Sequence, residues 1–249
     1  MSATSSGAAF SRGAAPVVSV VIPCLNEEDT IAAVVADVLA QGVNEVVVAD
    51  GGSADLTAER ARQAGARVVH ETRSGYGQAI QAGIAAVRVD TDIVVFLDGD
   101  GSDRPEMIPA LIEPIASGRA VFVHGSRVQG ECESGSLSAQ QRIAGAVAGL
   151  LLRLVYGARF TDMSPFRAIR RDALAQLGMR ETTFGWNLEM LMRVSASGFP
   201  ALEIPTGQRR RAGGVSKVSG NTLVGLKAAW SIATTFVRLA LTLRRAPRV

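Results

Sequence analysis

Apolar residues in the first half of the chain form short runs that alternate with longer amphipathic segments. The first run, Val17–Ile22, is rich in β-branched residues and ends at Pro23, which is typical of a strand buried on both faces. The segment from Glu27 to about Gln41 carries its apolar residues at helical spacing on one face. The same alternation predicts further strands at Glu45–Ala49, Arg67–His70 and Ile93–Leu97 and helices at about 55–64 and 77–87. Strands and helices that alternate at this spacing predict an α/β fold with a doubly wound, mostly parallel sheet flanked by helices.

The second half of the chain has a less regular pattern. It predicts a strand at Ala120–His124, helices at Gln141–Tyr156 and Trp186–Ala196, and a short strand at Ala201–Ile204. A Gly- and Arg-rich loop at 206–221 then leads into a long helix from about Leu223 to Arg245. We therefore expect a basic, amphipathic C-terminal helix, assigned to 221–249.

Length and composition favour one large domain, which we assign to 16–220. The chain has 249 residues, of which 47% are hydrophobic, enough to form a sizeable core. Residues 1–15 are rich in Ser, Ala and Gly and lack the apolar core of a signal peptide, so we expect a flexible tail there. The two cysteines, Cys24 and Cys132, provide neither a disulfide framework nor metal-ligand spacing, which favours a cytoplasmic setting.

The net charge of +3 hides an asymmetry between the body of the chain and its end. Residues 207–249 contain nine Lys and Arg and no acid, because the last acidic residue is Glu203. The rest of the chain holds 17 bases and 23 acids. A basic end on an acidic body indicates an anionic partner, such as phosphate, acidic lipid or nucleic acid. No aromatic platform accompanies these arginines, so we do not expect a nucleic-acid partner.

Two carboxylates follow the apolar strand predicted at 93–97. Asp98 and Asp100 flank Gly99, so a buried strand delivers two acids at its carboxyl end. Because unpaired charges beside a core are costly, such acids usually meet a cation. A divalent metal that carries a diphosphate fits this pattern, and the glycine would let a ligand approach the backbone. The alternative is a pair of surface acids that cap the next segment.

Ligands of doubly wound sheets gather beyond the carboxyl ends of the strands. Asp50 ends the second predicted strand, where it either binds a base or ribose or begins a turn. Gly77 lies in a turn before a helix, where backbone N–H groups would face a phosphate, although a plain turn explains it equally well. The first strand is not followed by G-x-G-x-x-G, and the chain has no G-x-x-x-x-G-K-[ST] loop. These absences argue against a dinucleotide site and a P-loop.

Eight segments between residues 18 and 217 together make the chain resemble the family 2 glycosyltransferases of the GT-A fold. Among these it is most similar to the dolichyl- and polyprenyl-phosphate sugar synthases. The segments are Val21–Glu28, Asp50–Asp55, Arg73–Ala79, Asp98–Asp100, Gly125–Arg127, Asp162–Arg167, Gly185–Met190 and Arg211–Lys217. Each is weak evidence when taken singly, but eight in the family's order are specific.

The resemblance implies a nucleotide-sugar-binding half at 16–125, an acceptor half at 126–220 and inversion at the anomeric carbon. For the donor's base and ribose it implies Pro23, Leu25, Glu27 and Asp50, with Gly77 and Gly99 also on the donor side. For the diphosphate and a Mg²⁺ or Mn²⁺ ion it implies Asp98 and Asp100. For phosphate groups of donor or acceptor it implies Arg127, Arg211 and Lys217. The chain departs from the family pattern at Gly51, where a second aspartate is usual, and at Ser102, where glutamine is frequent. Ser102 is therefore only a weak third metal ligand.

The expected reaction moves a sugar from a UDP- or GDP-linked donor. Asp100, Arg211 and Lys217 are the expected catalytic groups, because fixed positive charge and a Lewis acid stabilise the leaving diphosphate. Glu189 is the candidate base if the acceptor is an alcohol, and its alternative is an i,i+4 pair with Arg193. An anionic lipid phosphate needs no base. The bases in 207–217 favour such a polyprenyl-phosphate acceptor over a soluble hydroxyl acceptor, and a non-catalytic sugar-nucleotide-binding module is the remaining rival.

The C-terminal helix is expected to lie on a membrane surface through 221–245. Its polar side chains share one narrow face, apolar residues cover most of the rest, and Lys227 and Arg238 make it a poor spanning helix. Packing on the domain or on a second copy in a homodimer is the alternative. The helix at Gln141–Tyr156 would give a further lipid-facing surface. We therefore expect a cytoplasmic protein, peripheral on the inner face of the plasma membrane.

Overall fold

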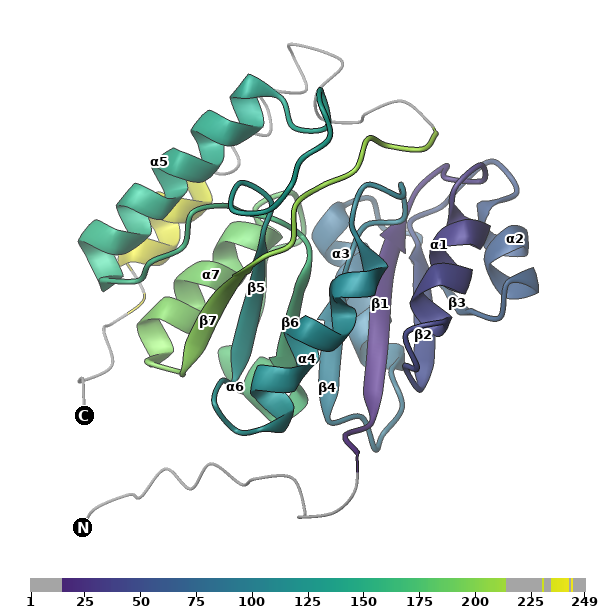
Figure 1. The fold of residues 1–249 in the computed structure, drawn as a ribbon, viewed down its shortest axis with the longest axis horizontal. Coiled ribbons are helices and arrows are strands. Elements are labelled where there is room, and N and C mark those ends of the chain that lie inside the picture. Colours follow the sequence, from purple (N-terminus) through teal and green to yellow (C-terminus); the bar gives the residue numbers. More distant parts are fainter. Residues whose placement is uncertain (1–14, 214–229, 231–233, 242, 244–249) are drawn as a thin grey trace.

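One sheet of seven strands forms the centre of the computed structural model, which describes residues 15–213, 230, 234–241 and 243 (Figure 1). The strands are β1 (Val18–Cys24), β2 (Glu45–Asp50), β3 (Arg67–His70), β4 (Ile93–Phe96), β5 (Phe122–Ser126), β6 (Arg167–Arg170) and β7 (Ala201–Pro205). Their order in the sheet is β3-β2-β1-β4-β6-β5-β7. Only β6 runs antiparallel to its neighbours, so the prediction of a doubly wound, mostly parallel sheet is confirmed.

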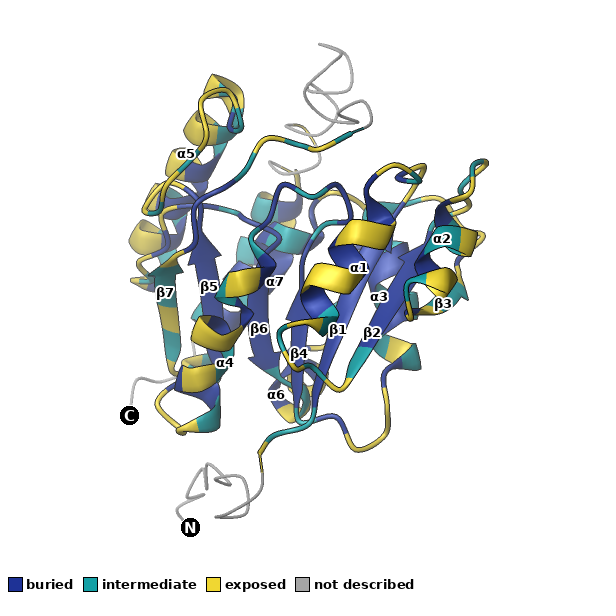
Figure 2. Cartoon of the chain, turned by 45° about the vertical axis from the view of Figure 1, so that its right-hand side comes forward, coloured by how far each residue is buried: buried dark blue, intermediate teal, exposed yellow. Residues whose placement is uncertain are grey.

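Helices cover both faces of this sheet and enclose a hydrophobic cluster on each (Figure 2). They are α1 (Ile31–Leu39), α2 (Thr57–Gln63), α3 (Tyr76–Ala86), α4 (Ile108–Ala116), which follows the 3₁₀ turn η1 (Pro105–Met107), α5 (Ala139–Tyr156), α6 (Arg171–Leu177) and α7 (Trp186–Ser197). One cluster joins the sheet to α1 and α4, and the other joins it to α3, α5, α6 and α7. Alternate residues of each strand thus enter opposite clusters, as expected for strands buried on both faces.

Two central elements have no counterpart in the sequence prediction. Helix α4 contains Pro109 in its first turn and Pro114 in its interior, and proline normally predicts a break. Strand β6 reads Arg-Ala-Ile-Arg, which lacks the apolar run of a central strand, yet it lies between β4 and β5. Arg167 is nevertheless fully buried, because its guanidinium donates to the backbone carbonyls of Ser164, Pro165 and Asn187.

Strand register brings the predicted chemistry to one edge of the sheet. In the parallel pair β1–β2, Cys24 lies opposite Asp50, and β4 lies on the other side of β1. The segments that follow these three strands therefore leave the sheet side by side. This edge holds the residues that the sequence assigned to the donor side, apart from Gly77 in α3.

Several terminal predictions fall on residues that the structure does not describe. They are the tail 1–15, of which only residue 15 is described, and most of the helix 221–249. Residues 234–241 are described and are helical. Across the described parts of the chain, no helix combines the length and the apolar character needed to cross a bilayer.

We expect Gly77→Ala to destabilise the protein, although alanine is the better helix former by about 1 kcal/mol. A Cβ at Gly77, in the first turn of α3, would lie 2.4 Å from the carbonyl oxygen of Glu181 and 2.9 Å from the Cα of Thr182. Because these are backbone atoms, the turn must shift, and we expect a loss of about 1–3 kcal/mol in the free energy of unfolding, measured by urea denaturation.

Gly51→Ala is the matched control for this substitution. Its added Cβ would meet only the carbonyl oxygen of Cys24, at an ordinary 3.5 Å. We expect a change within about 0.5 kcal/mol. Equal stability of the two variants would contradict the packing argument for Gly77.

Candidate active site

Two carboxylates at the end of β4 form the centre of the site. Asp100 is buried and Asp98 is half-buried. Burial, followed by the negative charge of Asp100, raises the pKa of Asp98 to about 7. The two acids therefore repel each other in a place where water does little to screen them. This is the electrostatic state that a bound cation would relieve.

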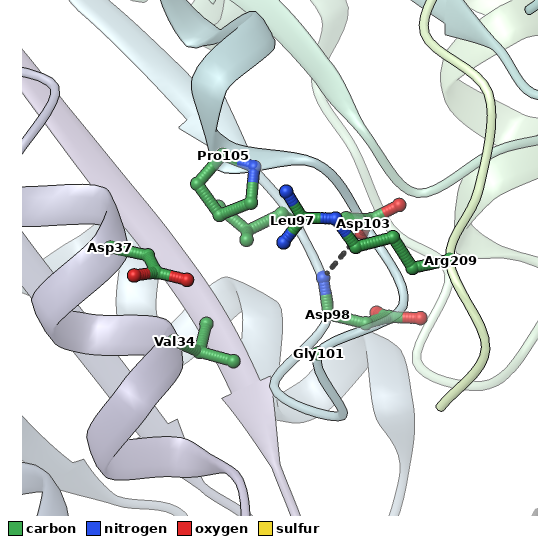
Figure 3. Close-up of a pocket in the computed structure, with 8 residues that line it drawn as sticks. All are labelled: Val34, Asp37, Leu97, Asp98, Gly101, Asp103, Pro105 and Arg209. Atoms are coloured by element: carbon green, nitrogen blue, oxygen red, sulfur yellow. Dashed lines mark hydrogen bonds between the residues drawn. The ribbon is translucent and has the colours of Figure 1, made fainter. Parts of the chain in front are cut away.

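Asp103 and Tyr76 complete this carboxylate cluster, and the sequence reasoning gave neither of them a role. Asp103 is buried, and its Oδ2 accepts the backbone N–H of Asp98 at 2.9 Å (Figure 3). Burial and the charges of Asp98 and Asp100 raise the pKa of Asp103 well above its usual value. Tyr76 donates its hydroxyl to Asp98 Oδ1 at 3.0 Å. Two features of the sequence could have indicated these residues: Asp103 is a third acid five residues after Asp98, and Tyr76 lies in the family-like segment Arg73–Ala79.

Arg211 brings positive charge to the cluster from the far end of the domain. Its Nη2 lies 2.6 Å from Asp100 Oδ2 and its Nη1 lies 3.2 Å from Glu27 Oε1. The N–H of Ala212 donates to the carbonyl oxygen of Asp100 at 3.2 Å. Figure 1 shows the segment after β7 crossing above the sheet edge toward β1. The structure thus joins three residues that the sequence predicted: Glu27, Asp100 and Arg211.

The other residues assigned to the donor side lie at or just after the ends of β1 and β2. Pro23 is buried in β1, whereas Leu25 is 38% exposed just beyond the strand. Glu27 is buried, and its N–H donates to Thr57 Oγ1 at 2.8 Å. These residues follow one strand into the loop that precedes α1.

Asp50 is buried at the end of β2 and is already engaged by its neighbours. Its Oδ2 lies 3.0 Å from Nδ1 of His70, at the end of β3, and its Oδ1 accepts the N–H of Ser53. The contact with Ser53 is the turn that the sequence offered as the alternative for Asp50. The contact with His70, whose side chain is 54% exposed, was not foreseen.

The structure gives Gly99 and Ser102 surroundings different from those that the sequence suggested. A Cβ at Gly99 would lie 2.4 Å from Sγ of Cys24, so close packing against β1 requires glycine here. Ser102 is buried and its Oγ accepts from Nε2 of Gln208 at 3.3 Å, while its carbonyl oxygen accepts the N–H of Arg209. Ser102 thus connects the loop after β4 to the segment after β7.

Arg127 lies just after β5 in a buried ion pair. Its Nε and Nη2 donate to the two carboxylate oxygens of Asp162 at 2.6 and 2.7 Å. Burial would lower the pKa of Arg127, but the bonds to Asp162 raise it above its ordinary value. The guanidinium therefore stays charged and is oriented by Asp162, a partner that sequence reasoning did not assign to it.

Glu189 is fully buried in the first turn of α7, and its carboxylate accepts hydrogen bonds from protein groups. Its Oε1 accepts from Arg193 Nε at 2.8 Å, which is the i,i+4 pair that the sequence offered as the alternative to a base. Its oxygens also accept the backbone N–H groups of Arg180 and Glu181. This arrangement favours the structural interpretation of Glu189.

Of the two remaining predicted site residues, the structure describes only Gly77. Gly77 lies in the first turn of α3, next to Tyr76, where it packs on the 181–182 backbone. Lys217 lies outside the described residues. Within the described residues, no group of three or more His, Cys, Asp or Glu side chains is arranged as a complete metal cage.

The chemistry of the site follows from its charges. Buried carboxylates offer hard oxygen ligands of the kind that Mg²⁺ and Mn²⁺ prefer. Mg²⁺ usually takes only one or two protein carboxylates and completes its shell with phosphate oxygens and water, so a complete protein cage is not required. Asp98 and Asp100 thus fit a metal that arrives with a diphosphate.

Comparison with known proteins agrees with this geometry. The model of the family described as glycosyl transferase family 2 matches residues 19–178. An uncharacterized glycosyltransferase of Mycobacterium tuberculosis (strain ATCC 25618 / H37Rv) is 36% identical over 222 residues, which cover 88% of this chain and 99% of the relative. The dolichyl-phosphate hexose transferase of Haloferax volcanii is 34% identical over 198 residues, which cover 78% of this chain and 84% of the relative.

A solved structure with the same fold is glucosyl-3-phosphoglycerate synthase from Mycobacterium tuberculosis in complex with Mn²⁺, uridine-diphosphate-glucose and phosphoglyceric acid. It superposes with a TM-score of 0.70 at 25% identity, covering 90% of this chain and 80% of that chain. The chain therefore belongs to glycosyl transferase family 2, and it is a glycosyltransferase with the GT-A fold.

Proposed function

We propose that this protein transfers a sugar from a UDP- or GDP-linked donor to the phosphate of a polyprenyl-phosphate lipid, with Mg²⁺ or Mn²⁺. The observation that carries this proposal is the engagement of Glu189. A hydroxyl acceptor needs a base, and the carboxylate predicted for that role is buried among Arg193 and two backbone N–H groups. A lipid phosphate is already anionic near pH 7 and attacks without a base.

On the donor side, Pro23, Leu25, Glu27 and Asp50 would receive the base and ribose. Asp98 and Asp100 would hold the metal, which when bound supplies Lewis-acid stabilisation of the departing diphosphate. The fit rests on the raised pKa of Asp98 beside Asp100, since a divalent cation removes that repulsion. The structural relative with UDP-glucose and Mn²⁺ supports this choice of donor class and metal.

In the transfer step, an oxygen of the acceptor phosphate would form a bond to the anomeric carbon. The bond from that carbon to the diphosphate breaks, and the nucleoside diphosphate leaves with the electron pair. Arg211 would stabilise the added charge, and the support for this role is its guanidinium, which lies 2.6 Å from Asp100 Oδ2. Lys217 and Arg127 would add positive charge on the acceptor side, with Arg127 oriented by Asp162.

A soluble acceptor is the second candidate. The specific support for it is the structural relative that holds phosphoglyceric acid and covers 90% of this chain. The support for a lipid acceptor is the 34% identity to a dolichyl-phosphate hexose transferase. The proposed lipid acceptor implies a protein that works peripherally at the inner face of the plasma membrane.

An activity assay with each acceptor in turn distinguishes the lipid acceptor from the soluble one. Purified full-length protein with Mn²⁺ or Mg²⁺ is supplied with UDP- and GDP-sugars, and with either undecaprenyl phosphate in detergent or 3-phosphoglycerate. We expect one nucleotide sugar to be consumed, with the sugar recovered on the lipid phosphate. Transfer only to 3-phosphoglycerate would overturn the lipid acceptor and leave the glycosyltransferase assignment intact.

We expect Asp100→Asn to abolish metal-dependent donor binding and to lower kcat/KM by about 10²-fold or more. The amide removes a metal ligand and the charge that Arg211 faces at 2.6 Å. Calorimetric titration of UDP with and without Mn²⁺ measures the binding. Asp90→Asn, which changes an exposed acid paired only with Arg88 in the described structure, is the control and should retain both properties. Normal Mn²⁺-dependent binding in the Asp100 variant would refute the metal site.

We expect Glu189→Gln to reduce stability rather than the chemical step. An amide cannot accept from Arg193 and the N–H groups of Arg180 and Glu181 together, and we expect a loss of about 1–3 kcal/mol in the free energy of unfolding. Arg193→Gln breaks the same ion pair, keeps the carboxylate and should cause a similar loss. A kcat reduced by about 10²-fold or more in folded Glu189→Gln but not in Arg193→Gln would show instead that Glu189 is a base. A general base typically contributes about 10²–10⁴-fold to the rate.

A further inference from the structure

One face of α5 presents large apolar side chains to solvent. Ile143, Val147, Leu150 and Leu154 are 64%, 51%, 56% and 68% exposed, and their spacing of four, three and four residues aligns them along the helix. We call these four residues the α5 stripe. Figure 2 shows α5 at the margin of the molecule with its exposed positions facing outward. An apolar row of this kind marks an interaction surface more often than a single exposed side chain does.

The packing of the opposite face fixes this orientation of α5. Gly145, Ala148, Gly149, Leu152 and Tyr156 are buried. A Cβ at Gly149 would lie 2.2 Å from the carbonyl oxygen of Phe160, so the helix approaches that backbone as closely as glycine permits. The helix begins with a capping box between Ser138 and Gln141. It therefore cannot turn its stripe inward without losing these contacts.

The charged residues of α5 and of the segment directly after it have one sign. Arg142 and Arg153 lie on the exposed face of α5, and Arg159 is exposed just beyond it. The sequence from 134 to 161 contains no acid. The C-terminal residues 207–249, which also lack acids, add exposed Val237 and Leu241 in the described part. This combination of apolar and cationic side chains is the signature of a helix that lies in an anionic membrane interface.

We propose that the α5 stripe docks this protein onto an anionic lipid bilayer, with Ile143, Val147, Leu150 and Leu154 at the headgroup–acyl boundary and Arg142 and Arg153 among the lipid phosphates. A second copy of the chain fits this face less well. A two-fold contact through α5 would bring its arginines together, with no acid on the helix to pair with them. A bilayer rich in anionic lipid supplies the missing negative charge.

The docking surface lies beside the acceptor side of the site. Gly145 of α5 packs on Asp162, with its hypothetical Cβ 3.1 Å from Asp162 Oδ1, and Asp162 is the carboxylate that orients Arg127. A bilayer held by α5 would therefore lie close to the arginine proposed to meet the acceptor phosphate. The link between the bilayer and the acceptor phosphate rests on the proposed function. Vesicle binding by α5 does not, because it is measured without turnover.

The test compares vesicle binding by full-length wild type with that of the quadruple variant Ile143→Ser, Val147→Ser, Leu150→Ser and Leu154→Ser. The probes are sedimenting vesicles of phosphatidylcholine, with and without phosphatidylglycerol. We expect wild type to bind the anionic vesicles, and the variant to show a partition coefficient at least about tenfold lower. The control Leu56→Ser with Val89→Ser removes two apolar side chains that are exposed elsewhere, and it should bind like wild type.

Three results would overturn the docking proposal. They are wild type that ignores anionic vesicles, a quadruple variant that binds them as well as wild type, and a wild-type dimer in sedimentation velocity that the variant converts to a monomer. UDP binding by the variant, unchanged from wild type, shows that it is folded. Failure of the proposed function looks different: stripe-dependent vesicle binding would persist while the sugar appears only on a soluble acceptor.

Discussion

The crowding of three carboxylates after β4, two of them buried and one half-buried, is the constraint on which the rest of the site depends. Burial and mutual repulsion raise the pKa of both Asp98 and Asp103, so the loop needs positive charge to remain in place with its acids ionised. Arg211 supplies that charge from the segment after β7, and it binds Asp100 and Glu27 together. The second half of the chain is therefore required to neutralise the acids of the first half. A metal with a diphosphate would act on the same imbalance, which links donor binding to the order of this loop.

How far the sequence predicts this structure depends on whether the signal is local. The apolar run before Asp98 and the alternation of strands and helices are local patterns, and they predicted the mostly parallel sheet correctly. Strand β6 and helix α4 were missed because their arginines and prolines contradict the local pattern, and tertiary contacts compensate for both. The pairing of Arg127 with Asp162 was also missed, because 35 residues separate the two and no local pattern connects them.

The acceptor side shows why residue type is a weaker guide than its partners. Glu189 and Arg127 both suggested chemistry from the sequence, and both are buried in charge pairs. For Glu189, the pairing uses the oxygens that a base needs. For Arg127, the pairing with Asp162 preserves the charge and fixes its direction, because a planar guanidinium bound at two nitrogens has little freedom. The same kind of contact thus argues against one predicted role and supports the other.

The acceptor chemistry and the exposed face of α5 impose related demands. A polyprenyl phosphate keeps its chain in the bilayer, so its phosphate stays at the interface and the protein must bring the site to that depth. Moving the lipid fully into water would cost about 0.8 kcal/mol for every CH₂ group exposed. A rigid helix that lies at the interface and packs directly on Asp162 would set this depth with little further motion. The apolar stripe, the glycines beneath it and the Asp162–Arg127 pair are then parts of one arrangement, in which membrane position determines where an incoming phosphate meets positive charge.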